Sequence, residues 1–112
     1  MDEQQPHDQR TRSDIDRLWL EALRSGRYKQ NYGSMRTDDE FCAIGVLCDV
    51  IDPTRWKRVT EIWYSWEGRN FRGLADLFPK IRQLNDIDKI PLSSIAFILE
   101  FSLLKNREKG IE

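Results

Sequence analysis

The sequence predicts an α+β fold, mainly α, with about four helices around one core and a small aromatic β-hairpin on one side. Apolar residues recur at helical spacing in four stretches, and residues 58–66 are rich in β-branched and aromatic types. The 112 residues are 39% hydrophobic and 33% charged, which fits one globular domain. We expect that domain to span residues 13–106, between a disordered N-terminal arm at 1–12 and a charged tail at 107–112.

The first helix is expected to begin at Ser13, with Asp16 three residues later in a variant of the capping box. Five apolar residues then share one helical face: Ile15, Leu18, Trp19, Ala22 and Leu23. Gly26 follows at the place where a left-handed residue commonly ends a helix. Residues 27–36 are predicted to form a loop or a short strand.

The second helix is predicted from a T-x-x-E capping box formed by Thr37 and Glu40. Its apolar face comprises Phe41, Ile44, Leu47, Cys48 and Ile51. Pro53 ends the helix, because the residue before a proline is disfavoured in the helical conformation. Gly45 costs a helix about 1 kcal/mol relative to alanine, so we expect Trp19 or a strand to approach it closely.

The hairpin is expected to comprise a strand at residues 58–66, a turn at 67–70 and a return strand that begins near Phe71. Apolar residues then recur at helical spacing: Leu74, Leu77, Phe78, Ile81 and Leu84. Pro79 interrupts them, so we expect a short turn followed by a short helix, since proline is tolerated at a first helical position. The last helix is predicted to begin at Pro91 and to run to about Leu104.

Four pieces of the chain carry recognisable motifs. They are residues 19–26 with Tyr28 and Gln30, FCAIGVLCD at 41–49, LND at 84–86, and Ile95-Ala96 with Glu100. Over most of residues 18–100 they resemble a family of small proteins found in phage genomes and some bacteria. Its members look like W-x-x-ALRSG-x-Y-x-Q, FC-x-LGVLCD, LND and an IA-x-x-IE helix. The chain departs from this pattern at Ala43, often a second cysteine, and at Phe97, usually polar. The resemblance implies an origin and no activity.

The inventory of reactive side chains argues against an enzyme, a metal site or a cofactor. Cys42 and Cys48 are six positions apart, about 240° around a helix, so their thiols are expected to point apart. Structural zinc needs four nitrogen or sulfur ligands, and the only histidine is His7 in the arm. A cysteine nucleophile also needs a base, usually histidine. We therefore expect buried structural cysteines, no metal, no cofactor and no enzymatic activity.

Charge and hydropathy exclude further classes. The formal net charge is −1, so no global field attracts nucleic acid or anionic membranes. No apolar run is as long as a membrane span. The first residues lack the basic-then-apolar layout of a secretion signal. We expect a cytoplasmic protein of the bacterial host that does not act at a membrane.

Residues 55–72 interleave aromatic side chains with five basic and two acidic ones. Aromatic rings and arginines on a hairpin can stack on bases and neutralise phosphates. This alternative function, binding of nucleic acid or a nucleotide, would use Arg58, Trp63, Trp66, Arg69 and Arg72. We favour the interpretation that one aromatic face of the hairpin packs on the helices and the other faces solvent.

The last helix is apolar on two sides. One stripe is expected in the core: Leu92, Ile95, Ala96, Leu99 and Leu103. A second stripe consists of Phe97, Phe101 and Leu104. A helix that is apolar on two faces is buried on two faces. The second stripe is therefore expected either to bind a protein partner, most simply in a homodimer, or to be covered by the hairpin and the first helix.

A loop offers one more candidate contact patch, formed by Tyr28, Lys29 and Gln30, because loops often carry function. The alternative is a turn that packs Tyr28 on the first helix. The leading functional hypothesis is a non-enzymatic binding module. It would be a phage accessory protein that engages a host or defence component or sequesters a small ligand, since binding through aromatic and apolar surfaces needs no catalytic group.

Overall fold

The computed structural model describes residues 10–68 and 74–108, with the backbone alone for residues 104–108. In these ranges the chain forms four α-helices, three short helical turns and five short strands. Their bounds are α1 Arg12–Arg24, β1 Lys29–Gln30, β2 Arg36–Thr37, β3 Glu40–Phe41, α2 Ala43–Ile51, η1 Pro53–Arg55, β4 Trp56–Arg58, β5 Trp63–Trp66, η2 Leu74–Leu77, α3 Phe78–Arg82, η3 Gln83–Ile87 and α4 Leu92–Glu108. The predicted α+β, mainly α class is confirmed.

Helix α1 begins earlier than the sequence predicted, because its N-cap is Thr11 and not Ser13. The backbone N–H of Asp14 donates to Thr11 Oγ1 at 3.1 Å, and the backbone N–H of Thr11 donates to Asp14 Oδ2 at 2.9 Å. These two bonds complete a capping box, which satisfies two backbone donors that a helix start leaves open. At the other end Gly26 has φ of +79°, the left-handed conformation expected after the helix.

Residues 10–12 belong to the folded domain and not to the predicted arm. The guanidinium of Arg10 donates to the carbonyl oxygens of Val50 and Ile51 at 2.9 and 2.6 Å. These carbonyls lie at the C-terminal end of α2, where carbonyl oxygens have no backbone N–H donor within the helix. The rest of the predicted arm, residues 1–9, lies outside the described residues, as do residues 109–112 of the predicted tail.

The segment around residues 37–42 departs furthest from the sequence prediction. Thr37 and Glu40 are register partners on the antiparallel strands β2 and β3, so the predicted capping box is wrong. Asp38 lies between them in the left-handed region, with φ of +55°. Helix α2 begins after Cys42, whose Sγ accepts a hydrogen bond from the backbone N–H of Gly45 at 3.3 Å. Pairing with neighbouring strands has overridden a local helix signal.

The five strands form one mixed sheet in the order β1-β3-β2-β5-β4, in which only β1 and β3 pair in parallel. The turn between β4 and β5 is at residues 59–62, within the stretch 58–66 that was predicted to be one strand, so that part of the prediction is wrong. The predicted turn at 67–70 lies partly outside the described residues. Val59 N–H donates to the Trp63 carbonyl at 2.8 Å, and Trp63 N–H donates to Thr60 Oγ1 at 3.1 Å. Thr60 thus shapes a turn inside the β-rich stretch. The predicted return strand at Phe71 lies outside the described residues.

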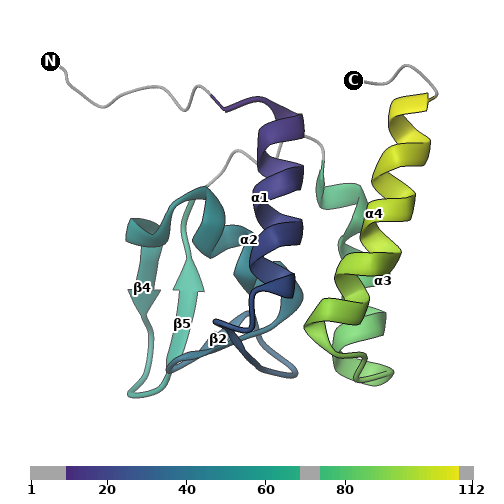
Figure 1. The fold of residues 1–112 in the computed structure, drawn as a ribbon. Helices are drawn as coiled ribbons and strands as arrows, with labels where there is room; N and C mark the ends of the chain where they lie inside the picture. The colour runs from purple at the N-terminus through teal and green to yellow at the C-terminus, as the bar shows by residue number, and fades with distance from the viewer. Residues whose placement is uncertain (1–9, 69–73, 109–112) are drawn as a thin grey trace, which may run out of the picture.

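Helix α1 lies between the sheet and α4, with α2 behind it (Figure 1). It packs on both α2 and α4. Trp19 is fully buried at this junction and donates its Nε1–H to the Ala43 carbonyl at 3.0 Å. The stripe predicted for the core side of the last helix is buried throughout: Leu92, Ile95, Ala96, Leu99 and Leu103.

Gly45 allows α2 to press against the segment before β2. A Cβ at this position would overlap the backbone carbonyl group of Met35. The same carbonyl accepts a hydrogen bond from Cys42 N–H at 3.0 Å. The predicted close approach is confirmed, and the neighbour is the Met35 backbone instead of Trp19.

Residues 74–87 follow the prediction of a turn and a short helix, with Pro79 in the first turn of α3. The hydrogen-bond spacing of the helix then widens in η3, which is a π-helical turn. Asp88 N–H donates to the Gln83 carbonyl, five residues back, at 2.9 Å. Asn85 lies within this wider turn and is directed into the protein. No helix of the described residues is long and apolar enough to cross a membrane.

Candidate functional site

Asn85 is the centre of a buried polar network between η3, α2 and the loop around β1. Its side chain is 1% exposed. Oδ1 accepts from Ala43 N–H at 3.1 Å and from Gln30 Nε2 at 3.0 Å. Nδ2 donates to the Asn31 carbonyl at 2.8 Å and to Asp86 Oδ1 at 2.7 Å. Both acceptor sites and both donor hydrogens of the amide are therefore used inside the protein.

A second network joins the first loop to the hairpin through Asp49. The Tyr28 hydroxyl donates to Asp49 Oδ2 at 2.7 Å, and Trp56 Nε1–H donates to Asp49 Oδ1 at 2.9 Å. Burial, and then the hydrogen bond to Asp49, raise the pKa of Tyr28 above its usual range. Tyr28 therefore remains a neutral donor at physiological pH, and each oxygen of Asp49 has a partner.

These networks account for the polar motif residues as parts of the fold: Tyr28, Gln30, Asp49, Asn85 and Asp86. Tyr28 is half-buried and bound to Asp49, while Gln30 reaches inward to Asn85 and also donates to the Ile90 carbonyl at 2.8 Å. Only Lys29 of the predicted loop patch is exposed. The three residues therefore do not form one contact surface.

Of the five residues of the nucleic-acid alternative, the structure describes three, and these three do not share one exposed surface. Trp66 is 9% exposed and donates its Nε1–H to the Asp52 carbonyl at 2.9 Å, so its ring is unavailable for stacking on a base. Arg58 and Trp63 are exposed on β4 and β5. Two further candidates lie outside the described residues: Arg69 and Arg72.

Two arginines on the sheet are already stacked on an aromatic ring. Strand register places Arg36 and Arg58 on either side of Tyr64. Their guanidinium carbons lie 4.1 and 5.1 Å from the centroid of the Tyr64 ring, within range of a cation–π interaction. Trp63 points to the opposite face of the strand, because successive side chains alternate. Of the cations predicted to contact nucleic acid, Arg58 is thus already stacked on a ring of the protein itself.

Helix α4 presents two phenylalanine rings to solvent. Phe97 and Phe101 are each 74% exposed, whereas Ile95 and Leu99 on the other side of the helix are buried. The alternative in which the hairpin and first helix cover this stripe is therefore wrong. Leu104, the third predicted member, belongs to the part of α4 whose side chains are outside the description. We call Phe97 and Phe101 the α4 ridge.

Both cysteines are free thiols in the interior, as predicted: Cys42 is 6% exposed and Cys48 is fully buried. Burial raises the pKa of each thiol. Because the thiolate is the reactive form, both side chains are poor nucleophiles at neutral pH. Across residues 10–68 and 74–103, whose side chains the structure describes, no three side chains of His, Cys, Asp or Glu are grouped to hold a metal ion.

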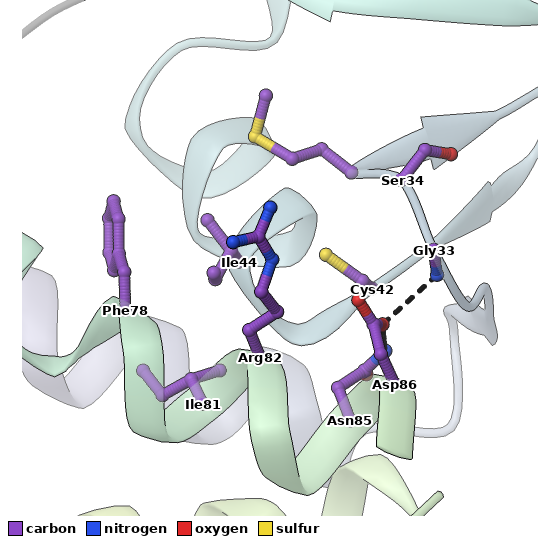
Figure 2. A pocket seen from close by; sticks show the side chains of 10 residues that line it. Gly33, Ser34, Cys42, Ile44, Phe78, Ile81, Arg82, Asn85 and Asp86 are labelled. Carbon is purple, nitrogen blue, oxygen red and sulfur yellow. Dashed lines mark hydrogen bonds between the residues drawn. The ribbon is translucent and has the colours of Figure 1, made fainter.

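A pocket of about 320 Å³ opens between the β1–β2 loop, the start of α2 and the α3–η3 segment (Figure 2). Its lining includes apolar and charged side chains: Met35, Ile44, Phe78, Ile81, Arg82 and Asp86. Gly33 N–H donates to Asp86 Oδ1 at 3.0 Å and holds the rim of the pocket. Sequence reasoning missed this pocket because three distant segments form it. Two of the motifs contribute to its walls: FCAIGVLCD through Cys42 and Ile44, and LND through Asn85 and Asp86.

The N-terminal part of the chain matches a known protein family. A family model described as Domain of unknown function (DUF8296) matches residues 11–72, which is more than half of the chain. No curated protein and no solved structure matches the chain. The matched region includes α1, the sheet and α2, while Asn85, the α3 side of the pocket and the α4 ridge follow it.

Proposed function

The chain belongs to the family described as Domain of unknown function (DUF8296), and we propose that it is a non-enzymatic binding module. Its leading partner is a second copy of the chain, bound through the α4 ridge. The observation that carries this proposal is the 74% exposure of both Phe97 and Phe101 on a helix whose other side is core. Adjacent exposed apolar side chains of this size commonly mark a site of association.

The shape of α4 suits pairing with an identical helix. Phe97 and Phe101 are one turn apart and form a ridge along the helix. One turn towards the N-terminus the exposed side chains are small, at Ser93 and Ser94. In a twofold, antiparallel pair of α4 helices, the phenyl rings of each copy would lie over the serines of the other. Large side chains opposite small ones allow the close helix spacing of ridge-into-groove packing.

The charges beside the α4 ridge are already paired within one copy. Arg24 of α1 forms an ion pair with Glu100 of α4. Further along α1, Arg17 lies 3.6 Å from an oxygen of Asp14 and 3.7 Å from one of Glu21. Because Arg24 neutralises Glu100, the carboxylate of Glu100 on α4 does not meet its symmetry mate as an uncompensated like charge.

The area of the α4 ridge sets the expected strength of the dimer. A phenylalanine buries roughly 150–250 Å² when it is fully covered. Two rings supply much less than the area of about 800 Å² per partner in a standard interface. We therefore expect a dimer that forms at high concentration and dissociates on dilution. The same exposed ridge would be free in the monomer to engage a host or defence component in the bacterial cytoplasm.

Sedimentation velocity over a wide range of protein concentration tests this proposal. The wild type is compared with the double variant Phe97→Ser and Phe101→Ser, and with Ile87→Ser as a matched control. Ile87 is 68% exposed on η3, so the control also removes an exposed apolar side chain. We expect the sedimentation coefficient to rise with concentration for the wild type and the control only. A wild type that stays monomeric, or a double variant that still dimerises, would contradict the proposal.

A second candidate function is supported by the exposure of Trp63 and Lys57, which strand register and alternation place on the same face of the hairpin. This ring and this cation could hold a short single strand through stacking and a phosphate contact, whereas Arg58 stacks on Tyr64 on the other face. Titration of tryptophan fluorescence with short oligonucleotides and common nucleotides at low salt is the test, with Trp63→Ala as the variant. Quenching that is lost in Trp63→Ala would support this function, and an unchanged signal in the wild type would remove it.

A further inference from the structure

The pocket beside α2 is separate from the α4 ridge and has a composition of its own. Figure 2 shows Ile44, Phe78 and Ile81 around one part of it, with Arg82 rising from α3 among them. Small-molecule sites are typically lined by apolar side chains and contain a few polar groups that orient the ligand. A volume of about 320 Å³ can accommodate a compact organic molecule.

Arg82 is the cation of this pocket. Its side chain is exposed, and the guanidinium forms no ion pair or hydrogen bond with the described residues. Asp86 lies one helical turn after Arg82 and forms no ion pair with it. Its Oδ1 instead accepts hydrogen bonds from Gly33 N–H and from Asn85 Nδ2. The pocket therefore offers an unpaired guanidinium beside an apolar wall. A guanidinium binds a carboxylate through two parallel hydrogen bonds.

The pocket does not suit a phosphate group. A helix N-terminus binds phosphate through free backbone N–H groups, but at α2 these groups have partners. Ala43 N–H donates to Asn85 Oδ1 and Gly45 N–H donates to Cys42 Sγ. The carboxylate of Asp86 at the rim would also repel a dianion more strongly than a monoanion.

We propose that this pocket binds a monocarboxylate with a compact apolar body, with the carboxylate on Arg82 and the body against Ile44, Phe78 and Ile81. Nothing in this assignment depends on dimer formation through α4. Cys42 lines the same pocket, so a bound ligand would also shield its thiol. Cys48 is fully buried and lies outside the lining, which makes Cys42 the thiol that reports on occupancy.

Calorimetric titration with a matched pair of probes tests the assignment. The probes are 4-methylpentanoate and its uncharged amide, with inorganic phosphate as a third. The variants are Arg82→Gln and, as a control, Lys80→Gln, which removes another exposed cation from α3. We expect the wild type to bind the carboxylate about tenfold more tightly than the amide. Arg82→Gln should abolish that preference, and Lys80→Gln should keep it.

Several outcomes would overturn the assignment: equal binding of carboxylate and amide, unchanged preference in Arg82→Gln, tighter binding of phosphate, or no binding at millimolar concentration. A second readout is the rate at which a thiol reagent modifies Cys42. The carboxylate should slow this reaction in the wild type and leave it unchanged in Arg82→Gln. Since neither Phe97 nor Phe101 lines the pocket, failure of the dimer proposal would not affect either readout.

Discussion

The buried network around Asn85 and the α4 ridge are built in opposite ways. At Asn85 every polar group of the side chain has a partner inside the protein, whereas at Phe97 and Phe101 two large rings face solvent. The network joins side chains and backbone groups from three segments of the chain, while the ridge consists of two large side chains one turn apart on one helix. The difference teaches that polar residues far apart in the sequence hold the architecture together, whereas the surface that we propose for association is formed by one helix alone.

The network also shows how the two parts of the chain depend on each other. Asn85 follows the region matched by the family model, yet it satisfies the backbone N–H of Ala43 inside that region. The indole Nε1–H of Trp19 donates to the carbonyl oxygen of Ala43 at 3.0 Å. The start of α2 is therefore completed by side chains from α1 and η3, and the domain should unfold as one cooperative unit.

Removing the centre of the network should have the largest effect. Asn85→Ala leaves the buried N–H of Ala43 and the carbonyl of Asn31 without their partner, at about 1–3 kcal/mol for each group. We expect the free energy of unfolding, measured in urea, to fall by about 3 kcal/mol or more. Gln83→Ala, an exposed change on the same turn, is the control and should lie near the wild type. A loss below about 1 kcal/mol would show that the network is not what holds α2 in place.

Filling the contact between α2 and the Met35 backbone should have the next largest effect. Gly45→Ala places a methyl group on the Met35 carbonyl, and a backbone group cannot rotate away as a side chain can. Overpacking of this kind typically costs about 1–3 kcal/mol, in spite of the better helix propensity of alanine. Urea unfolding should show the loss, and a more stable Gly45→Ala protein would mean that the close approach is relaxed in solution.

Cutting the Asp49 network should have a smaller effect. Tyr28→Phe removes one hydrogen bond to Asp49, which is worth about 1 kcal/mol. Because the pKa of Tyr28 is raised in the folded state, its contribution is present at neutral pH and is lost as pH rises above the ordinary tyrosine value of about 10. The difference in unfolding free energy between wild type and Tyr28→Phe should therefore shrink above about pH 10. A constant difference up to pH 11, roughly one unit higher, would rule out this role for the hydroxyl.

Particular residues show how far the sequence carried the interpretation. The helical stripe from Leu92 to Leu103 and the left-handed Gly26 were predictable, because periodicity and a glycine cap are local signals. The strand at Thr37 was not, since its capping box competes with strand pairing that only the folded chain supplies. The turn at Thr60 was likewise not predictable from the stretch 58–66, because its residue types favour a strand and only the folded chain shows which of them pair.

The candidate sites divide in the same way. The second apolar stripe of the last helix is visible in the sequence, but the sequence left open whether that stripe is exposed or covered, and the structure exposes Phe97 and Phe101. The pocket beside Arg82 could not be predicted, because its walls come from residues 33–44 and 78–86, and only folding brings these segments together. Trp66 was misassigned to a binding surface because period-two alternation does not say which face of a strand is covered.

The melting midpoint as a function of protein concentration tests the central claim most directly. If the α4 ridge serves association and not folding, the wild-type midpoint should rise with concentration, because dimerisation stabilises the folded chain by mass action. The double variant Phe97→Ser and Phe101→Ser should melt at one temperature at all concentrations, equal to that of the wild type at high dilution. A concentration-independent wild-type midpoint, or a double variant that melts well below the dilute wild type, would contradict the account.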